Sequence, residues 1–176
     1  DIQFAIDQLG IDDEMLVIAG DNLLDFSLTA FAKYAKEKNA SCIMRYYEPS
    51  VERLHKCGVV TIDDTDKILN MVEKPAETEV LSDLAVASRY LLSPEIFPLL
   101  RQTPRGKGNE LQLTDAMSKL LENDKMYGCK IAGKRYDLGS KMGFLKGTVE
   151  FGLRRAEFRE AFADFLRETV KNLEEK

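Results

Sequence analysis

Residues 15–22 read Met-Leu-Val-Ile-Ala-Gly-Asp-Asn, an apolar run that stops at a glycine and an acidic residue. Five consecutive apolar residues without helical spacing predict a strand over 15–19 that is buried on both faces, as in a parallel sheet. Gly20 lets the backbone turn and leaves Asp21 at the carboxyl end of this strand. Open α/β sheets bind ligands at that edge, so a carboxylate there is suited to a divalent metal. The alternative is an ordinary turn, because Gly, Asp and Asn end many strands.

The rest of the sequence alternates strand and helix patterns without repeats or linkers, which predicts a single α/β domain over residues 1–176. We expect helices over 2–9, 28–38, 111–122 and 143–154, and strands over 41–46, 58–62, 67–72, 84–91 and 126–132. The two strands around the polar turn 63–66 predict a hairpin. A further helix is expected to begin with Ser93 as N-cap and Pro94 at its first position.

The terminal helices, within 143–176, carry an apolar stripe at spacings near three and four. Its members are Phe158, Phe162, Phe165, Leu166, Val170 and Leu173. We expect a docking face rather than a catalytic one, either onto this chain or onto a second subunit.

Composition excludes several classes of protein. The chain has 176 residues, 44% of them hydrophobic, with a net charge of −5, which argues against a nucleic-acid or anionic-membrane surface. No apolar run approaches the roughly 20 residues of a membrane span. The odd, widely spaced Cys42, Cys57 and Cys129 show no metal-ligand pattern and predict reduced thiols in a cytoplasmic protein.

Three later segments, taken with Gly20-Asp21-Asn22, carry a family resemblance. They are Val72-Glu73-Lys74-Pro75, the run from Asn109 to Ala116, and Arg135-Tyr136-Asp137-Leu138-Gly139. In this order the set resembles the sugar-1-phosphate nucleotidyltransferases, and residues 82–154 are most similar to the bacterial UTP–glucose-1-phosphate uridylyltransferase branch. The resemblance implies a Rossmann-like, glycosyltransferase-A-like mixed sheet flanked by helices.

The resemblance also implies a reaction and its residues. A uridylyl group passes from UTP to glucose 1-phosphate, with Mg²⁺ held by Asp21 and Asp137. Glu73 would accept hydrogen bonds from sugar hydroxyls, and Lys74 would neutralise the phosphate as a catalytic residue. Gly58 would let the backbone approach the sugar ring. Glu110 would bind substrate, although a residue at the start of a helix can equally be a cap.

One family feature does not occur in this sequence, namely the glycine-rich nucleotide loop that ends in Thr-Arg. The resemblance therefore implies the carboxyl-terminal part of a nucleotidyltransferase domain, inactive alone, whose partners are glucose 1-phosphate, a nucleoside triphosphate and a second copy of the chain. Residues before about 76 look more like the thymidylyltransferase branch. Two alternatives stay open: a thymidylyltransferase acting on glucose 1-phosphate, or a non-catalytic sugar-phosphate-binding or assembly module.

Overall fold

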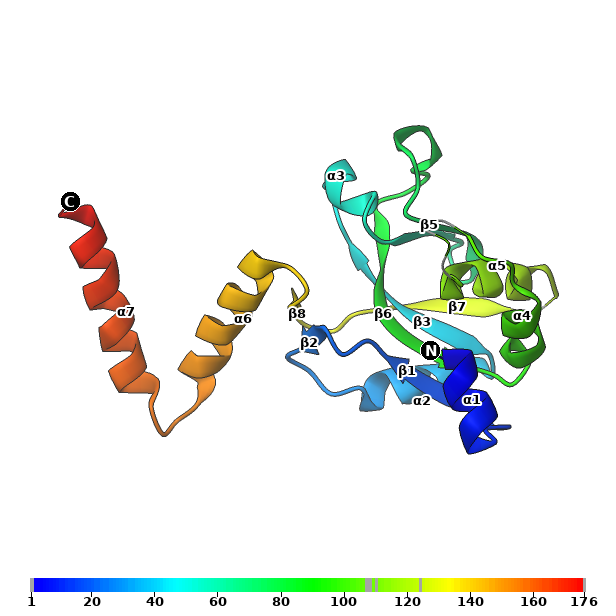
Figure 1. Cartoon of the computed structure of the whole chain (residues 1–176), viewed down its shortest axis with the longest axis horizontal. Helices are drawn as coiled ribbons and strands as arrows, with labels where there is room; N and C mark the ends of the chain where they lie inside the picture. The colour runs from blue at the N-terminus through cyan, green and yellow to red at the C-terminus, as the bar shows by residue number, and fades with distance from the viewer. Residues whose placement is uncertain (1, 107–108, 110, 124, 176) are drawn as a thin grey trace. The chain divides into compact units, whose positions relative to one another are not determined.

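A computed structural model describes residues 2–106, 109, 111–123 and 125–175. Their contacts divide the chain into two compact units (Figure 1). Unit 1 comprises Asp1–Ala19 and Phe26–Gly133, and unit 2 comprises Gly20–Asp25 and Lys134–Lys176. The expectation of a single domain over residues 1–176 stays a prediction.

The centre of unit 1 is a mixed six-stranded sheet. Five strands follow the order β5-β4-β6-β3-β7, and β1 pairs with β6. The strands are β1 (Met15–Ile18), β3 (Ser41–Tyr47), β4 (Gly58–Ile62), β5 (Ile68–Glu73), β6 (Leu84–Leu92) and β7 (Met126–Lys130). The β3–β7 pair is parallel and the other pairs are antiparallel, which confirms the mixed sheet.

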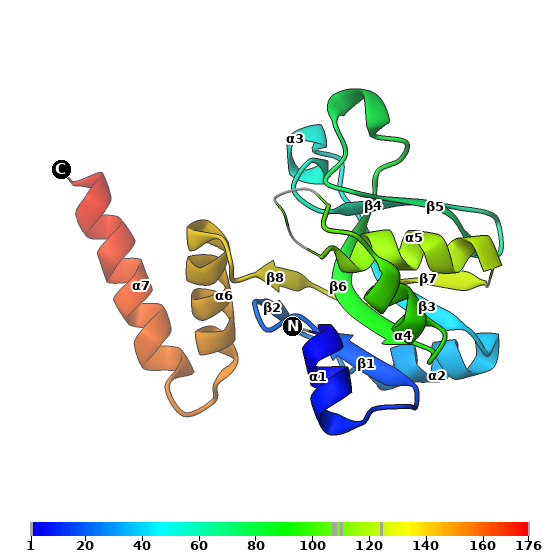
Figure 2. The same cartoon turned by 45° about the vertical axis from the view of Figure 1, so that its right-hand side comes forward.

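Helices pack against this sheet and close its core (Figure 2). They are α1 (Ile2–Leu9), α2 (Thr29–Lys38), α4 (Ile96–Gln102) and α5 (Leu113–Asn123), with the short α3 (Val51–Leu54) and the 3-10 turn Glu77–Glu79. Met117 and Leu120 of α5 join Ile43 and Val60 of the sheet in one buried cluster. Alternation along β3 places Cys42 and Met44 on the opposite face from Ile43.

The hairpin over 58–72 is confirmed, but the strand predicted over 15–19 differs from its prediction. β1 pairs antiparallel with β6, not parallel. Its side chains alternate: Met15 and Val17 are half-buried, whereas Leu16 and Ile18 are 43% and 50% exposed. The prediction of a strand buried on both faces was therefore wrong. An apolar run of this length is equally compatible with a strand that is covered on one face only.

The expected start of α4 was also wrong. Its N-cap is Glu95, because residues 93–95 form a turn in which Ile96 and Phe97 donate to the carbonyls of Ser93 and Pro94. The Ser93 hydroxyl lies 3.0 Å from the Ser41 hydroxyl of β3. A tertiary hydrogen bond thus replaces the cap that the local sequence predicts.

Unit 2 consists of a two-stranded ribbon and two helices. β2 (Asn22–Leu24) pairs antiparallel with β8 (Arg135–Asp137), and α6 (Lys141–Arg154) packs on β8 and on α7 (Arg159–Glu174). The edge of the Phe162 ring lies directly over Gly152, at the bend between the helices.

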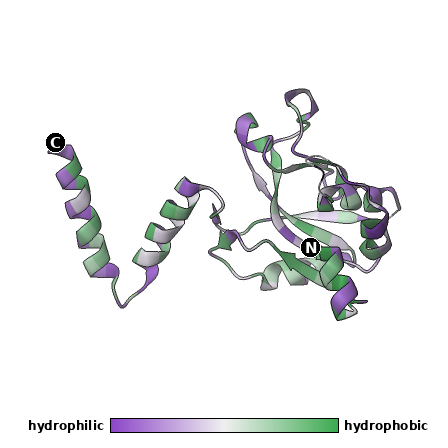
Figure 3. Ribbon diagram, viewed as in Figure 1, coloured by the Kyte–Doolittle hydropathy of each residue, from purple (hydrophilic) through white to green (hydrophobic). Residues whose placement is uncertain are grey.

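The apolar stripe of α7 is largely uncovered. No α7 residue is buried, and Figure 3 shows both hydrophobic (green) and hydrophilic (purple) residues along this helix. Phe165 and Leu173 are 60% and 68% exposed. Within the part of the chain that the structure describes, no helix is long and apolar enough to cross a membrane, and all three cysteines are free thiols.

Candidate functional site

Two predicted sugar-site residues of unit 1 lie opposite one another in the β4–β5 hairpin. Gly58 is paired directly with Glu73. A Cβ added to Gly58 would lie 3.2 Å from Oε2 of Glu73 and 3.2 Å from Cγ2 of Val86. Because the glycine has no side chain, the Glu73 carboxylate rests close to the β4 backbone.

The Glu73 carboxylate is held by partners that the sequence analysis missed. The Thr114 hydroxyl, buried in the first turn of α5, donates to Oε2 of Glu73 at 2.6 Å. On β6, burial, followed by the nearby Glu73 charge, raises the pKa of Tyr90 to about 12. Only the Leu-Thr-Asp run at the start of α5 could have signalled Thr114, since hydroxyls are common in first turns.

Lys74, the third predicted sugar-site residue, has a left-handed backbone with φ of +46°. Such a conformation is uncommon for residues other than glycine. The next residue is the buried Pro75, and a proline restricts the backbone of the residue before it. Two contacts stabilise it: the Lys74 N–H donates to the Cys57 carbonyl at 3.0 Å, and His55 Nδ1 lies 2.7 Å from the Pro75 carbonyl oxygen. Strain of this kind, fixed by its surroundings, is typical of a functional residue.

The remaining predicted substrate residue, Glu110, lies outside the described residues. Before it in the sequence, Arg105 donates to the Asn109 carbonyl at 2.8 Å. Oδ2 of Asp115, in the first turn of α5, lies 2.6 Å from the position a Gly106 Cβ would occupy. The structure therefore places Asp115 beside this loop.

Unit 2 brings the two predicted metal ligands together. Asp21 precedes β2 and Asp137 ends β8, and the Leu138 N–H donates to the Asp21 carbonyl at 2.7 Å. Oδ2 of Asp21 and Oδ1 of Asp137 each lie 3.2 Å from one point, the position of a Cβ added to Gly139. The two oxygens are thus at most twice that distance apart.

This pair of carboxylates fits a small hard cation. Mg²⁺ takes oxygen ligands at about 2.1 Å, keeps several waters, and is usually held by one or two carboxylates and substrate phosphates. A cation bound to one oxygen could reach the other directly or through a coordinated water. The space between them is open because Gly139 has no side chain. Among the described residues no group of three or more acidic, His or Cys side chains forms a metal site.

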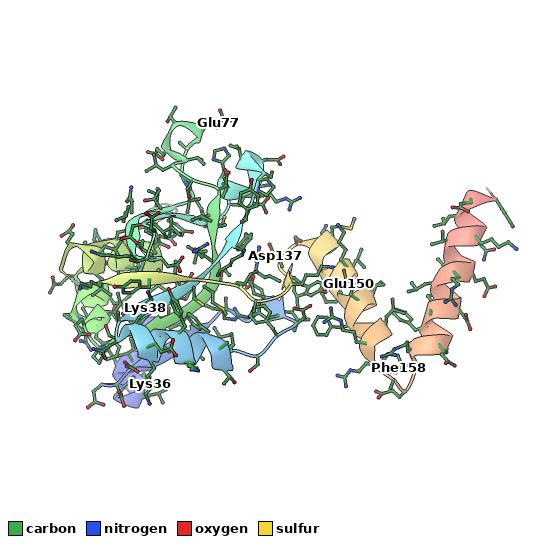
Figure 4. The ribbon with its side chains drawn as sticks, turned by 180° about the vertical axis from the view of Figure 1, so that it is seen from behind. Lys36, Lys38, Glu77, Asp137, Glu150 and Phe158 are labelled. Carbon is green, nitrogen blue, oxygen red and sulfur yellow. The ribbon has the colours of Figure 1, made fainter. Side chains whose placement is uncertain are left out.

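A hydrogen-bonded network supports β8 from the side of α6. Tyr136, buried beside Asp137, donates to Glu150 at 2.7 Å and accepts from Arg154 at 3.1 Å. Arg154 also donates to Asp25 at 3.1 Å, and Figure 4 shows Asp137 at the end of β8 with Glu150 along α6.

Electrostatics make this network sensitive to acid. The Lys134 N–H, with help from Arg154, lowers the pKa of Asp25. The Lys134 ammonium, followed by the Tyr136 hydroxyl, lowers the pKa of Glu150. The folded protein therefore stabilises the charged forms of both carboxylates.

Comparison with known proteins identifies what the chain is similar to. A family model described as "Nucleotidyl transferase" matches residues 2–151. A putative UTP–glucose-1-phosphate uridylyltransferase of Methanocaldococcus jannaschii is 39% identical over 167 residues, which cover 92% of this chain and 58% of that protein. The UTP–glucose-1-phosphate uridylyltransferase of Bacillus subtilis is 33% identical over 170 residues, with coverage of 93% and 58%. The chain spans somewhat over half the length of these relatives.

Solved structures show the same similarity. A UDP-glucose pyrophosphorylase in complex with UDP-glucose superposes with a TM-score of 0.79 at 30% identity, covering 88% of this chain and 61% of that one. A UTP-bound UGPase from Acinetobacter baumannii gives a TM-score of 0.80 at 26% identity, with coverage of 95% and 60%.

Proposed function

This chain belongs to the nucleotidyl transferase family, and we propose that its residues serve the transfer of a uridylyl group from UTP to glucose 1-phosphate. In this reaction a phosphate oxygen of the sugar bonds to the α-phosphorus of UTP, and the bond to pyrophosphate breaks. The proposal rests on one observation above all: Glu73 is held over Gly58 by Thr114, beside the strained Lys74. The names of the relatives support the choice of substrates.

Glu73 and Lys74 divide the recognition of the sugar phosphate. The Oε2 atom of Glu73 is bonded to Thr114, and the remaining acceptor capacity of the carboxylate suits two vicinal sugar hydroxyls. The Lys74 ammonium is a compact point charge suited to a phosphate. The incoming oxygen is already anionic, so binding and alignment, rather than a general base, accelerate the step.

Asp21 and Asp137 are the proposed ligands of Mg²⁺. When bound, the cation supplies charge neutralisation to the phosphate oxygens. The protein contributes a pre-formed pair: Asn22 donates to Oδ1 of Asp21 at 2.8 Å, and the Gly139 N–H donates to Oδ1 of Asp137 at 3.1 Å. These bonds fix both carboxylates before any ligand arrives.

Two further properties belong to the proposal. The three free thiols accord with a cytoplasmic location, where disulfides are rare. The exposed stripe of α7 accords with a homo-oligomer, because apolar side chains of this kind are commonly covered by a second copy.

Binding measurements with paired ligands test the sugar-phosphate site. Calorimetry with glucose 1-phosphate and with glucose is compared for the chain, Lys74→Met and Glu73→Gln. Lys74→Met should lower the affinity for glucose 1-phosphate by about tenfold or more and leave the affinity for glucose unchanged, because only the phosphate interacts with the lysine charge. Glu73→Gln should lower the affinity for both ligands. Lys36→Met, on the exposed surface of α2, is the matched control. Binding that neither variant affects would refute the assignment.

Pyrophosphate release separates the candidate reactions. Turnover of glucose 1-phosphate with UTP in preference to dTTP supports uridylyl transfer, and the reverse preference supports the thymidylyltransferase alternative. A chain that binds glucose 1-phosphate without releasing pyrophosphate from either nucleotide acts by itself as a sugar-phosphate-binding module, as the inactive carboxyl-terminal part of a nucleotidyltransferase would. The last outcome is a real alternative, because the chain spans only 58% of the length of its relatives.

A further inference from the structure

Gly139 lies in the turn from β8 to α6, between Asp137 and the helix N-cap Ser140. A Cβ at this position would stand 3.2 Å from Oδ1 of Asp137 and 3.2 Å from Oδ2 of Asp21. Its third neighbour would be Cγ of Asp21, at 3.9 Å. The missing side chain would therefore face the carboxylate pair.

The neighbouring Gly143 shows what a purely structural glycine looks like here. A Cβ on Gly143 would lie 1.9 Å from the carbonyl oxygen of Asp137, a backbone atom that cannot give way. The fold itself thus forbids a side chain at 143. Its N–H donates to the hydroxyl of the N-cap Ser140 at 3.0 Å.

Gly139 has no comparable structural requirement. The φ of Gly139 does not lie in the left-handed region. Among the described residues, the glycine with such a φ is Gly10. An alanine could therefore adopt the same backbone without strain. The only close contacts that its methyl group would make are with the two carboxylates.

We propose that Gly139 determines which cation the Asp21–Asp137 pair accepts, by leaving the space between the carboxylates open to a small ion and its waters. The inference rests on the proposed role of this pair as Mg²⁺ ligands. A methyl group 3.2 Å from both oxygens is tighter than an ordinary van der Waals contact, so each carboxylate must shift by a few tenths of an ångström.

Such a shift affects Mg²⁺ more than Ca²⁺. Mg²⁺ needs near-ideal octahedral geometry at about 2.0–2.1 Å and gives up its waters reluctantly, whereas Ca²⁺ accepts irregular geometry at about 2.3–2.6 Å. The methyl group both displaces the ligands and occupies volume that coordinated waters use. Gly139→Ala should therefore reverse part of the selectivity for the smaller ion.

Cation titration tests the inference without an activity assay. Free Mn²⁺ is followed by electron paramagnetic resonance, and Mg²⁺ or Ca²⁺ is added as competitor to the chain, to Gly139→Ala and to Gly20→Ala. Gly20 is the matched control, because it adjoins Asp21 and a Cβ there would meet nothing within 4 Å. Asp137→Asn checks that the bound Mn²⁺ reports this site.

Gly139→Ala should lower the affinity for Mg²⁺ by about tenfold or more, the size of effect seen when the support of a metal site is altered. The affinity for Ca²⁺ should fall several-fold less, and the thermal unfolding curve and the Gly20→Ala titration should match the wild type. Unchanged Mg²⁺ affinity in Gly139→Ala would overturn the inference and leave the carboxylate site intact. Equal losses of affinity for Mg²⁺ and Ca²⁺ in Gly139→Ala, together with a lower melting temperature, would show that Gly139 has a structural role only. A wild-type chain that binds no Mn²⁺ would overturn the proposed site and this inference together.

Discussion

Tyr136→Phe tests whether the network behind the carboxylates stabilises unit 2 independently of unit 1. The substitution keeps the ring, which is 4% exposed and packs edge-on against Phe151 with centroids 5.3 Å apart. It removes the hydroxyl that donates to Glu150 and accepts from Arg154. The lost interactions are therefore two charge-assisted hydrogen bonds at nearly constant packing.

The expected magnitude follows from the exposure of the partners. Hydrogen bonds to charged groups contribute about 1.5–3 kcal/mol when they are well desolvated. The side chains of Glu150 and Arg154 are 36% and 44% exposed, so water replaces part of what is lost. We expect a loss of about 1–2 kcal/mol in the free energy of opening unit 2, which corresponds to roughly 5- to 30-fold faster amide exchange.

Amide hydrogen exchange read by NMR is the appropriate assay, because it reports each unit separately. Exchange should accelerate at the amides of β2 and β8 and at that of Leu138, which follows β8, and stay unchanged in β3 and β6 of unit 1. Tyr47→Phe, at the exposed end of β3, is the matched control. Unchanged exchange in β2 and β8 would refute the stabilising role. Equal acceleration in β6 would refute the independence of the two units.

Three further predictions concern unit 2. Gly143→Ala should unfold the start of α6, because its Cβ would lie 1.9 Å from the Asp137 carbonyl oxygen; loss of the unit 2 signals from a ¹H–¹⁵N spectrum checks this, and a native spectrum would contradict it. Asp25 and Glu150 have lowered pKa values, so their stabilising contribution is present above the usual carboxylate pKa of about 4 and is lost as the pH falls through the lowered values. Near-ultraviolet circular dichroism during an acid titration should show this loss, and Asp25→Asn should reduce it. Phe165→Asp should lower the mass measured by sedimentation at micromolar concentration if a second copy covers α7, and an unchanged mass would argue against that interface.

The sequence predicted most of the architecture because local patterns determine it. The alternation over 58–72 around a polar turn correctly gave the β4–β5 hairpin. The short apolar run over 15–19 predicted the strand but not its partner, because burial on one face or two depends on elements far away in the sequence. Ser93 failed as a cap for the same reason: its hydroxyl is engaged by Ser41 across the sheet.

The candidate site was predictable only where a motif marks it. Asp21 and Asp137 came from short motifs, and the β2–β8 pairing does bring them together. Thr114 lies within the Asn109–Ala116 run, but no local pattern shows that Thr114 or Tyr90 approaches Glu73. Their closeness follows from α5 packing on β5 and from β6 pairing with β4, the neighbour of β5. Gly139 was visible in the sequence, but its relation to two carboxylates 116 positions apart in the chain, at 21 and 137, needs coordinates.

Paramagnetic mapping with Mn²⁺ tests the central claim most directly, since it shows where a divalent cation binds to this chain. At low Mn²⁺ the ¹H–¹⁵N signals of Asp21, Asn22, Leu138 and Gly139 should broaden first, and excess Mg²⁺ should restore them. Broadening that begins instead at the acidic turn 63–66 of unit 1, or that persists in Asp137→Asn, would contradict the assignment of the carboxylate pair.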